Sequence, residues 1–291
     1  MENISELKQH LRAIEQTRQI SNAMYLLSTS RMKKSMQHID YNLEYIRRLR
    51  ATVKDIISKT KHNMLSDPFL ELKEGGKALF FVITSDKGLC GGYNSALVNL
   101  ALEKMRGYEQ PVLHSLGLKG TEMFQSRGIT PDYIEYGASQ HPTLYSARAL
   151  GEHITELYNN CSANEVYFVY TEYVSSSLQR PVCKRVLPLL RRDFADVEYE
   201  NKYISDVIYE PDLQTVFDKI VPQYIIGLMY DIMMQSAASE NAARMTAMLN
   251  ATDNADKMIE TLGARINAER QLAITNEITE IAAATELDGA V

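Results

Sequence analysis

One short run of the sequence combines residue types that could do chemistry: Thr84-Ser-Asp-Lys-Gly-Leu-Cys-Gly-Gly-Tyr-Asn94. The run follows an apolar stretch that predicts a strand and opens a predicted helix, so its backbone amides and the helix dipole could cradle a phosphate. It contains neither GxxxxGK[ST] nor GxGxxG, and no acidic residue is placed for a ribose or a magnesium ion. We therefore interpret Gly88, Gly91 and Gly92 as residues of a tight turn, with a nucleotide-binding enzyme as the alternative.

A cysteine beside a lysine in the same run is a second chemical candidate. Lys87 could lower the pKa of the Cys90 thiol, but no histidine lies near in the sequence to act as a base. We expect both to be exposed loop residues without a catalytic role. The six histidines have no HExxH or paired ligand spacing. They are at positions 10, 38, 62, 114, 141 and 153. The sequence predicts no catalytic residue, no metal site and no cofactor.

Composition excludes several classes of function. The 291 residues carry 31 Lys plus Arg against 37 Asp plus Glu, and a net charge of −6 gives no reason to expect binding to nucleic acid. Cys90, Cys161 and Cys183 are far apart and fit neither a disulfide framework nor a zinc site. The longest apolar run, Ala78 to Ile83, is far shorter than the roughly 20 residues that cross a bilayer, and no signal or transit segment is expected at the N-terminus.

The sequence predicts a long helix on each side of the segment that contains the Thr84 to Asn94 run. Neither glycine nor proline occurs from Met1 to Asp67, which predicts one helix from about residue 3 to 60. Its apolar stripe starts with Ile4, Leu7, Leu11 and Ile14, lapses over Thr17 and Arg18, and resumes further on. The resumed stripe comprises Leu43, Ile46, Leu49, Val53 and Ile56. Such a helix would be about 85 Å long, too long for one compact core, and so needs an elongated partner.

The C-terminal part of the sequence supplies that partner. After Pro211 and Pro222 the pattern is helical to the end, with a slowly drifting stripe that is rich in small residues. The stripe comprises Leu228, Ile232, Ala238, Ala242, Met245, Leu249, Thr252, Met258, Leu262 and Ile266. Helices from the two ends of one chain would pair antiparallel. The alternative is a free-standing coiled-coil scaffold.

Between the helices the pattern alternates between short strands and short helices, which indicates an α/β domain. Strands are predicted at 78–84, 111–116, 165–174 and 180–190, and helices at 94–106, 119–125 and 144–158. The fold class is thus α/β plus a long antiparallel coiled coil. The predicted parts are an N-terminal shaft helix (1–66), a Rossmann-like α/β domain (75–200) and a C-terminal shaft helix (207–291).

Parts of both helices read as surfaces for partners. Basic residues cluster at Arg31, Lys33 and Lys34 and again at Arg47, Arg48 and Arg50, and such clusters are either solvated faces or docking sites for acidic loops. The runs from Arg244 to Asn254 and from Arg270 to Thr275 are polar and small where a buried helix would be apolar. They indicate a surface presented to another molecule.

Several motifs, in order along the whole chain, resemble the gamma subunit of F-type rotary ATP synthase, the central rotor shaft of that enzyme. They are Thr17-Arg-Gln-Ile-Ser-Asn-Ala-Met24, Ser30-Arg-Met-Lys-Lys34, Ser85-Asp-Lys-Gly-Leu-Cys-Gly-Gly-Tyr-Asn94, Tyr209-Glu-Pro-Asp212, Ala238-Ser-Glu-Asn-Ala-Ala-Arg-Met-Thr-Ala-Met248, Ala251-Thr-Asp-Asn254 and Arg270-Gln-Leu-Ala-Ile-Thr-Asn-Glu-Ile278. At Ile266-Asn-Ala-Glu-Arg-Gln271 the chain departs from the family pattern, because an acid stands where the family has a basic residue.

The resemblance implies a left-handed antiparallel coiled coil with a Rossmann-like domain at its foot, turning inside a ring of alpha and beta subunits. It implies contacts with the beta subunit at two groups of residues, which are Met24, Lys87 and Cys90, and Arg270, Gln271 and Thr275. By the same resemblance Tyr209 and Glu210 face the membrane c-ring, and the α/β domain holds the epsilon subunit. The expected role is to couple ion flow through the ring to ATP synthesis or the reverse, as a non-catalytic, peripheral subunit on the cytoplasmic face of the plasma membrane.

Overall fold

The computed structural model describes residues 4–59, 68–70, 77–137, 140, 142–160, 163–197 and 209–288, with side chains up to residue 281. His62, His141 and Cys161 lie outside the described residues. In chain order the elements are α1 (Ile4–Lys59), the 3-10 helix η1 (Pro68–Leu70), β1 (Ala78–Ile83), α2 (Tyr93–Met105), β2 (Pro111–Leu116), α3 (Leu118–Gln125), β3 (Tyr133–Glu135), α4 (Leu144–Asn159), β4 (Glu165–Tyr173), β5 (Gln179–Leu187), the 3-10 helix η2 (Arg191–Phe194) and α5 (Leu213–Asp288).

The chain divides into two compact units. One unit combines residues 1–27 with 245–291, and the other comprises residues 28–244. We call them the terminal unit and the α/β unit. The predicted division at 1–66, 75–200 and 207–291 stays a prediction, because its limits at 60–66, 75–76, 198–200, 207–208 and 289–291 lie outside the described residues.

The α/β unit contains a five-stranded sheet in the order β3-β2-β1-β4-β5. The first four strands in this order pair in parallel, and β5 pairs antiparallel with β4. The predicted strands and helices of this region are present, apart from shifts of a few residues at their ends. The sequence pattern missed β3, because a strand of three half-buried residues has too few positions to show a period.

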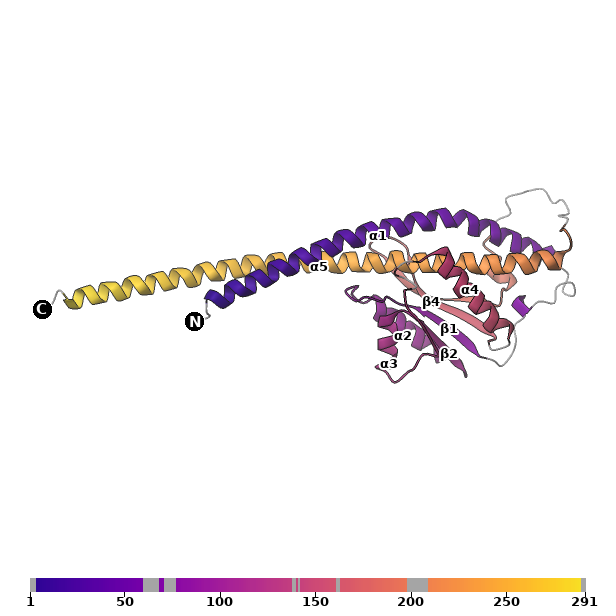
Figure 1. The fold of residues 1–291 in the computed structure, drawn as a ribbon, viewed down its shortest axis with the longest axis horizontal. Coiled ribbons are helices and arrows are strands. Elements are labelled where there is room, and N and C mark those ends of the chain that lie inside the picture. The colour runs from indigo at the N-terminus through magenta and orange to yellow at the C-terminus, as the bar shows by residue number, and fades with distance from the viewer. Residues whose placement is uncertain are drawn as a thin grey trace. The chain divides into compact units, whose positions relative to one another are not determined.

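Both faces of the sheet are covered, and this explains why β1 is apolar at every position. Leu79, Phe81 and Ile83 face one core, which they share with α4 and with the parts of α1 and α5 in this unit. The alternate residues Phe80 and Val82 face a second core, formed with α2 and α3. Figure 1 shows α2 and α3 on one side of the strands and α4 with α5 on the other. The middle of the chain is therefore a three-layer α/β structure.

Helix α5 begins at Leu213, shortly after Pro211. The Asp212 carboxylate accepts hydrogen bonds from the Thr215 backbone N–H and hydroxyl, each at 2.8 Å, which caps the first turn. Pro222 then lies inside the helix. A proline costs a helix interior about 3 kcal/mol, and the complete burial of Phe217 and Val221, which both precede Pro222 in the helix, offsets that cost.

In the terminal unit, the two helices pack through positions that repeat every seven residues. Leu7 and Ile14 of α1 form a buried cluster with Ala255, Leu262 and Ile266 of α5. We call this cluster the seam. Its heptad spacing is the pattern of a coiled coil. An exposed ion pair between Arg18 and Asp256 flanks the seam.

Three residues of the predicted stripes do not belong to a buried face. Leu43, Leu249 and Met258 are 62%, 43% and 47% exposed, so their assignment to the stripes was wrong. Smaller residues take the buried heptad positions instead, among them Ser21 and Ser28. A pattern that scores apolarity passes over such residues, although close helix packing favours them.

A buried histidine lies on β2, between β1 and β3. The His114 ring on β2 packs against Phe81 and Tyr133, with ring centroids 4.6 and 5.4 Å away, and His153 of α4 lies 5.9 Å away. His114 Nδ1 has no hydrogen-bond partner among the described residues. Burial first, and then the neighbouring His153, lower the pKa of His114 to about 4, against a smaller opposing effect of Asp132.

This histidine predicts a specific loss of stability in acid. Because the folded pKa lies below the unfolded value of about 6.5, the unfolded chain binds the extra proton first, and stability falls as the pH drops from about 6.5 to 4. Between pH 7 and 4.5 the His114→Gln variant should lose roughly 2 kcal/mol less free energy of unfolding than the unsubstituted chain. Urea titrations at both pH values measure this difference. The exposed His10, replaced in His10→Gln, is the control, and equal pH dependence in all three chains would contradict the prediction.

Candidate functional site

The loop that the sequence singled out lies where open α/β sheets usually bind ligands. The chain adds β2 and β3 on one side of β1 and then returns to add β4 on the other, so the strand order reverses at β1. Ligands in such folds bind beyond the carboxyl ends of the strands at the reversal. The loop at residues 84–92 follows β1 at this point. We call it the glycine loop.

Side chains within the glycine loop fix its start. The Asn94 amide oxygen accepts a hydrogen bond from the Ser85 backbone N–H at 2.9 Å, and the Asn94 amide group donates to the Ser85 hydroxyl at 2.7 Å. The Asp86 carboxylate accepts bonds from the backbone N–H groups of Leu118 and Gly137. Gly91 has a φ of 57°, which confirms the predicted tight turn at that glycine.

Helix α5 fills the crevice beyond β1 and β4. Its Ser239 hydroxyl donates to the Thr171 carbonyl of β4 at 3.0 Å, and the Tyr93 hydroxyl donates to the Ser236 carbonyl at 3.3 Å. The Arg244 guanidinium donates to the carbonyl oxygens of Lys87 and Gly88. A phosphate-binding loop presents N–H groups to its ligand, whereas here two loop carbonyls face a cation of the same chain. The crevice is thus a packed interface, which argues against a nucleotide site there.

The structure corrects one expectation about the two chemical candidates of this loop. Lys87 is exposed as predicted, but Cys90 is only 2% exposed, so its assignment as an exposed loop residue was wrong. The Cys90 sulfur accepts a hydrogen bond from the Asn94 amide at 3.3 Å. Burial raises the pKa of the Cys90 thiol despite opposing contributions from Ser85 and Arg244, so the thiolate nucleophile is disfavoured. Cys90 is a packing residue that holds the glycine loop.

The polar run around Arg244 is also corrected in part. The sequence placed Arg244 on a surface presented to another molecule, yet Arg244 is 7% exposed and Met248 is 6% exposed. Leu249 is exposed, as the prediction required. Sequence reasoning missed the burial of Arg244 because the loop carbonyls that it binds are more than 150 residues away in the chain. The one local signal was a charged residue at the end of a run of small residues.

Tyr209 and Glu210 precede α5 in the same unit. The Tyr209 hydroxyl donates to the Asp55 carboxylate of α1 at 2.7 Å, and the Glu210 side chain is exposed. The tyrosine thus ties the residues before α5 to the end of α1, while the acid remains open to solvent. One residue of the basic cluster on α1 already has a partner within the α/β unit, since Arg50 forms an ion pair with Asp196.

The other predicted contact residues belong to the terminal unit. Met24 is half-buried on α1, and Ile20 and Leu27 are 62% and 51% exposed. Their spacing of four and three residues places these three side chains on one helix face, which we call the first stripe. The first stripe has a signal in the sequence that was not used as a prediction. The pattern of the buried face lapses at Thr17, while apolar residues continue beyond it.

A second exposed apolar face follows the seam on α5. Ile274, Ile278 and Ile281 are 45%, 62% and 63% exposed, and their spacing again places them on one face, which we call the second stripe. The predicted contact residues Arg270, Gln271 and Thr275 are all exposed along the same segment. Exposed apolar faces rimmed by polar residues mark sites of protein association.

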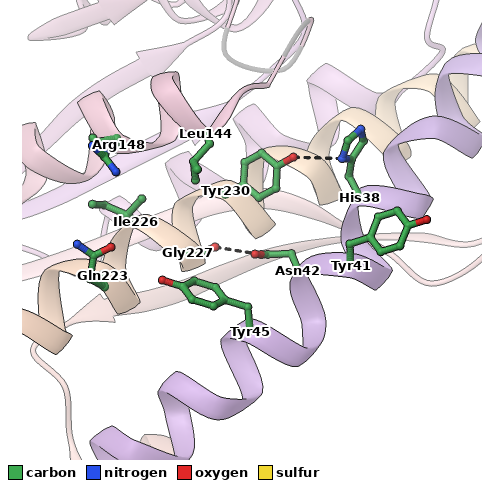
Figure 2. A pocket seen from close by; sticks show the side chains of 10 residues that line it. All are labelled: His38, Tyr41, Asn42, Tyr45, Leu144, Arg148, Gln223, Ile226, Gly227 and Tyr230. Carbon is green, nitrogen blue, oxygen red and sulfur yellow. Dashed lines mark hydrogen bonds between the residues drawn. The ribbon is translucent and has the colours of Figure 1, made fainter.

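One pocket of the α/β unit lies among α1, α4 and α5, with a volume of about 370 Å³. Figure 2 shows the side chains that line it, among them tyrosines from α1 and α5 and Arg148 from α4. The Tyr230 hydroxyl lies 3.3 Å from His38 Nδ1, and the Asn42 amide donates to the Gly227 carbonyl at 3.2 Å. The ten lining residues include one histidine and no carboxylate or thiol, so the pocket does not offer a pair of acid and base.

In the described part of the chain, no three or more His, Cys, Asp or Glu side chains gather in a group that could hold a metal ion. None of the described helices has the length and apolar character needed to cross a membrane.

Comparisons with known proteins agree with each other. The family model described as ATP synthase matches residues 3–286. The ATP synthase gamma chain of Clostridium pasteurianum is 33% identical over 284 residues, which cover 96% of each chain. The corresponding protein of Ruminiclostridium cellulolyticum is 35% identical, also with 96% of each chain covered. Among solved structures, the rotor of Euglena gracilis mitochondrial ATP synthase matches 93% of this chain and 98% of its own with a TM-score of 0.65, at 16% identity.

Proposed function

The chain belongs to the ATP synthase gamma-chain family, the non-catalytic central-stalk rotor subunits of ATP synthase, and from this premise we propose how its two units serve that role. We propose that rotation of this chain couples ion flow through a membrane ring to ATP synthesis on beta subunits, or ATP hydrolysis to ion pumping. The protein is a peripheral part of a membrane complex. We place it on the cytoplasmic face of the plasma membrane.

The observation that carries this proposal is the pair of exposed apolar stripes, one on each helix of the terminal unit. The seam holds the two helices of the terminal unit together, while the Ile20–Leu27 face and the Ile274–Ile281 face remain uncovered. Alpha and beta subunits would cover them. Met24 would then contact beta through the first stripe, and Arg270, Gln271 and Thr275 would contact it beside the second stripe.

In the α/β unit, the tip of the glycine loop is the proposed contact with beta. Lys87 is exposed and Leu89 is 60% exposed, so the loop offers a cation beside an apolar side chain. Cys90 takes part through the loop conformation that it holds, not through its own surface. Glu210 would face the membrane c-ring with Tyr209 as its anchor on Asp55, and the α/β unit would hold the epsilon subunit.

The alternative functions receive less support. A nucleotide-binding enzyme needs a free crevice beyond β1, and α5 occupies that space. A free-standing scaffold would use the same stripes to bind other chains, so its partners distinguish it. We expect a tagged copy, expressed at native level in its own cells, to purify with alpha and beta subunits. Purification without either one would refute the rotor role.

A matched pair of substitutions tests the second stripe. Ile278→Asp places a charge on the stripe, whereas Thr279→Asp places the same charge on the adjacent, exposed position of the same helix. We expect the first to lower the yield of alpha and beta subunits on the tagged chain roughly tenfold, because a charge buried in an apolar contact costs over 1 kcal/mol. Quantitative mass spectrometry of the purified complex measures the yield. Equal yields from the two variants would contradict the assignment of this face.

A further inference from the structure

A buried ion pair joins two residues one turn apart on α5. The Arg244 and Glu240 side chains are 8% and 4% exposed, and Arg244 Nη2 lies 2.8 Å from a carboxylate oxygen of Glu240. Charged side chains are almost never buried so completely unless they are paired. A buried pair of this kind stabilises a fold little, so its presence calls for another role.

The glycine loop gives that role. Arg244 Nη2 donates to the carbonyl oxygens of Lys87 at 3.0 Å and Gly88 at 3.2 Å, and its Nε donates to Gly88 at 3.3 Å. A guanidinium is a rigid planar fork, so it fixes two adjacent carbonyls in direction as well as position. The Glu240 carboxylate in turn accepts a hydrogen bond from the guanidinium. We call this arrangement of Glu240, Arg244 and the two loop carbonyls the clamp.

The loop would not adopt this conformation by itself. Leu89, the residue after the two clamped carbonyls, has a φ of 63°, which is in the left-handed region that non-glycine residues rarely adopt. Such residues persist where surrounding contacts determine the backbone. The clamped carbonyls precede Leu89, and the buried Cys90 follows it.

We infer that Arg244 and Glu240 are positioning residues that set the orientation of the glycine loop from α5 and so aim Lys87. This inference rests on the proposed function for its consequence, because Lys87 is the proposed contact with beta. Arg244 is the last residue of the α/β unit.

The Cys90 thiol is a direct reporter of the clamp. In the full-length chain with Cys161→Ser and Cys183→Ser, its rate of alkylation measures how often the loop opens. We expect Arg244→Lys, which keeps the charge but loses the fork, to raise the rate roughly tenfold, since charge-assisted hydrogen bonds to the loop are lost. The double variant Glu240→Gln with Arg244→Met removes both charges without leaving one unpaired, and we expect the same increase.

The control is an arginine with similar bonds elsewhere. Arg50 donates to the Asp193 carbonyl at 2.8 Å and pairs with Asp196, so Arg50→Lys makes the same chemical change away from the loop. An increase in the Arg244 variants with an unchanged rate in Arg50→Lys supports the clamp. Unchanged alkylation in the folded Arg244→Lys chain, or an equal increase in Arg50→Lys, overturns it.

The assembled complex separates this inference from the proposed function. If Lys87 contacts beta, the Arg244→Lys complex should pump fewer ions for each ATP hydrolysed than the parent complex. Faster alkylation of Cys90 together with unchanged pumping would support the clamp and refute the contact of Lys87 with beta. If Cys90 is alkylated no faster in the Arg244→Lys chain than in the parent chain, the clamp is overturned, whatever number of ions the complex pumps for each ATP.

Discussion

Replacing Gly117 with alanine is expected to prevent stable folding of the α/β unit. A Cβ atom at this position would lie 2.3 Å from the carbonyl oxygen of Thr84 and 2.6 Å from its hydroxyl. Gly117 also has a φ of 127°, in the region that side chains avoid. Thr84 cannot retreat easily, because its backbone N–H donates to the Leu116 carbonyl at 2.8 Å and it begins the glycine loop.

The expected cost of Gly117→Ala exceeds about 4 kcal/mol, since a backbone clash and a strained φ add at one residue. Urea unfolding followed by circular dichroism measures it. Gly88→Ala is the matched control in the neighbouring loop, where an added Cβ would meet no atom within 4 Å. If the free energies of unfolding of the Gly117→Ala and Gly88→Ala chains differ by less than about 1 kcal/mol, which is the scale of ordinary surface substitutions, the close approach of Gly117 to Thr84 is not required.

The sequence predicted most elements of this fold because their signals are local. The glycine-free N-terminal stretch predicted a helix from 3 to 60, and α1 spans 4–59. The apolar run of β1 depends on neighbours within a few positions. β3 escaped because its three residues are defined by pairing with β2 rather than by their own pattern.

The site was harder to predict, since its contacts connect distant parts of the chain. Nothing near Cys90 in the sequence indicates that α5 covers it, and so its burial was missed. Arg244 looked like a surface residue for the same reason, because its acceptors at Lys87 and Gly88 are more than 150 residues away. The family motifs pointed to segments of the chain, but they could not say which residues in them face outward.

The buried faces of α1 and α5 pose the opposite difficulty, since small residues hide their period. Ser21, Ser28 and Ala255 occupy buried positions, while the larger Leu249 and Leu43 are exposed. Apolarity therefore separates the buried face from the surface poorly on these helices. Burial separates them well, and it predicts opposite outcomes for two isoleucines on one helix.

Ile14→Asp is expected to separate the two helices of the terminal unit. Ile14 is 8% exposed in the seam, and a carboxylate there would lose its apolar contacts and be buried without water. The expected loss is about 3 kcal/mol or more. Arg18, one turn further, offers little compensation, because it is 45% exposed and already pairs with Asp256. Hydrogen exchange should accelerate at amides of both helices beside the seam.

Ile20→Asp makes the same change on the same helix at a residue that is 62% exposed. In the isolated chain we expect it to leave hydrogen exchange unchanged, because the seam is intact. In the assembled complex both variants should fail, Ile14→Asp through the seam and Ile20→Asp through the stripe proposed to contact beta. Equal exchange in the two isolated chains would contradict the seam, whereas normal assembly of Ile20→Asp would contradict the stripe. The pair thus separates what holds the terminal unit together from what it presents to its partners.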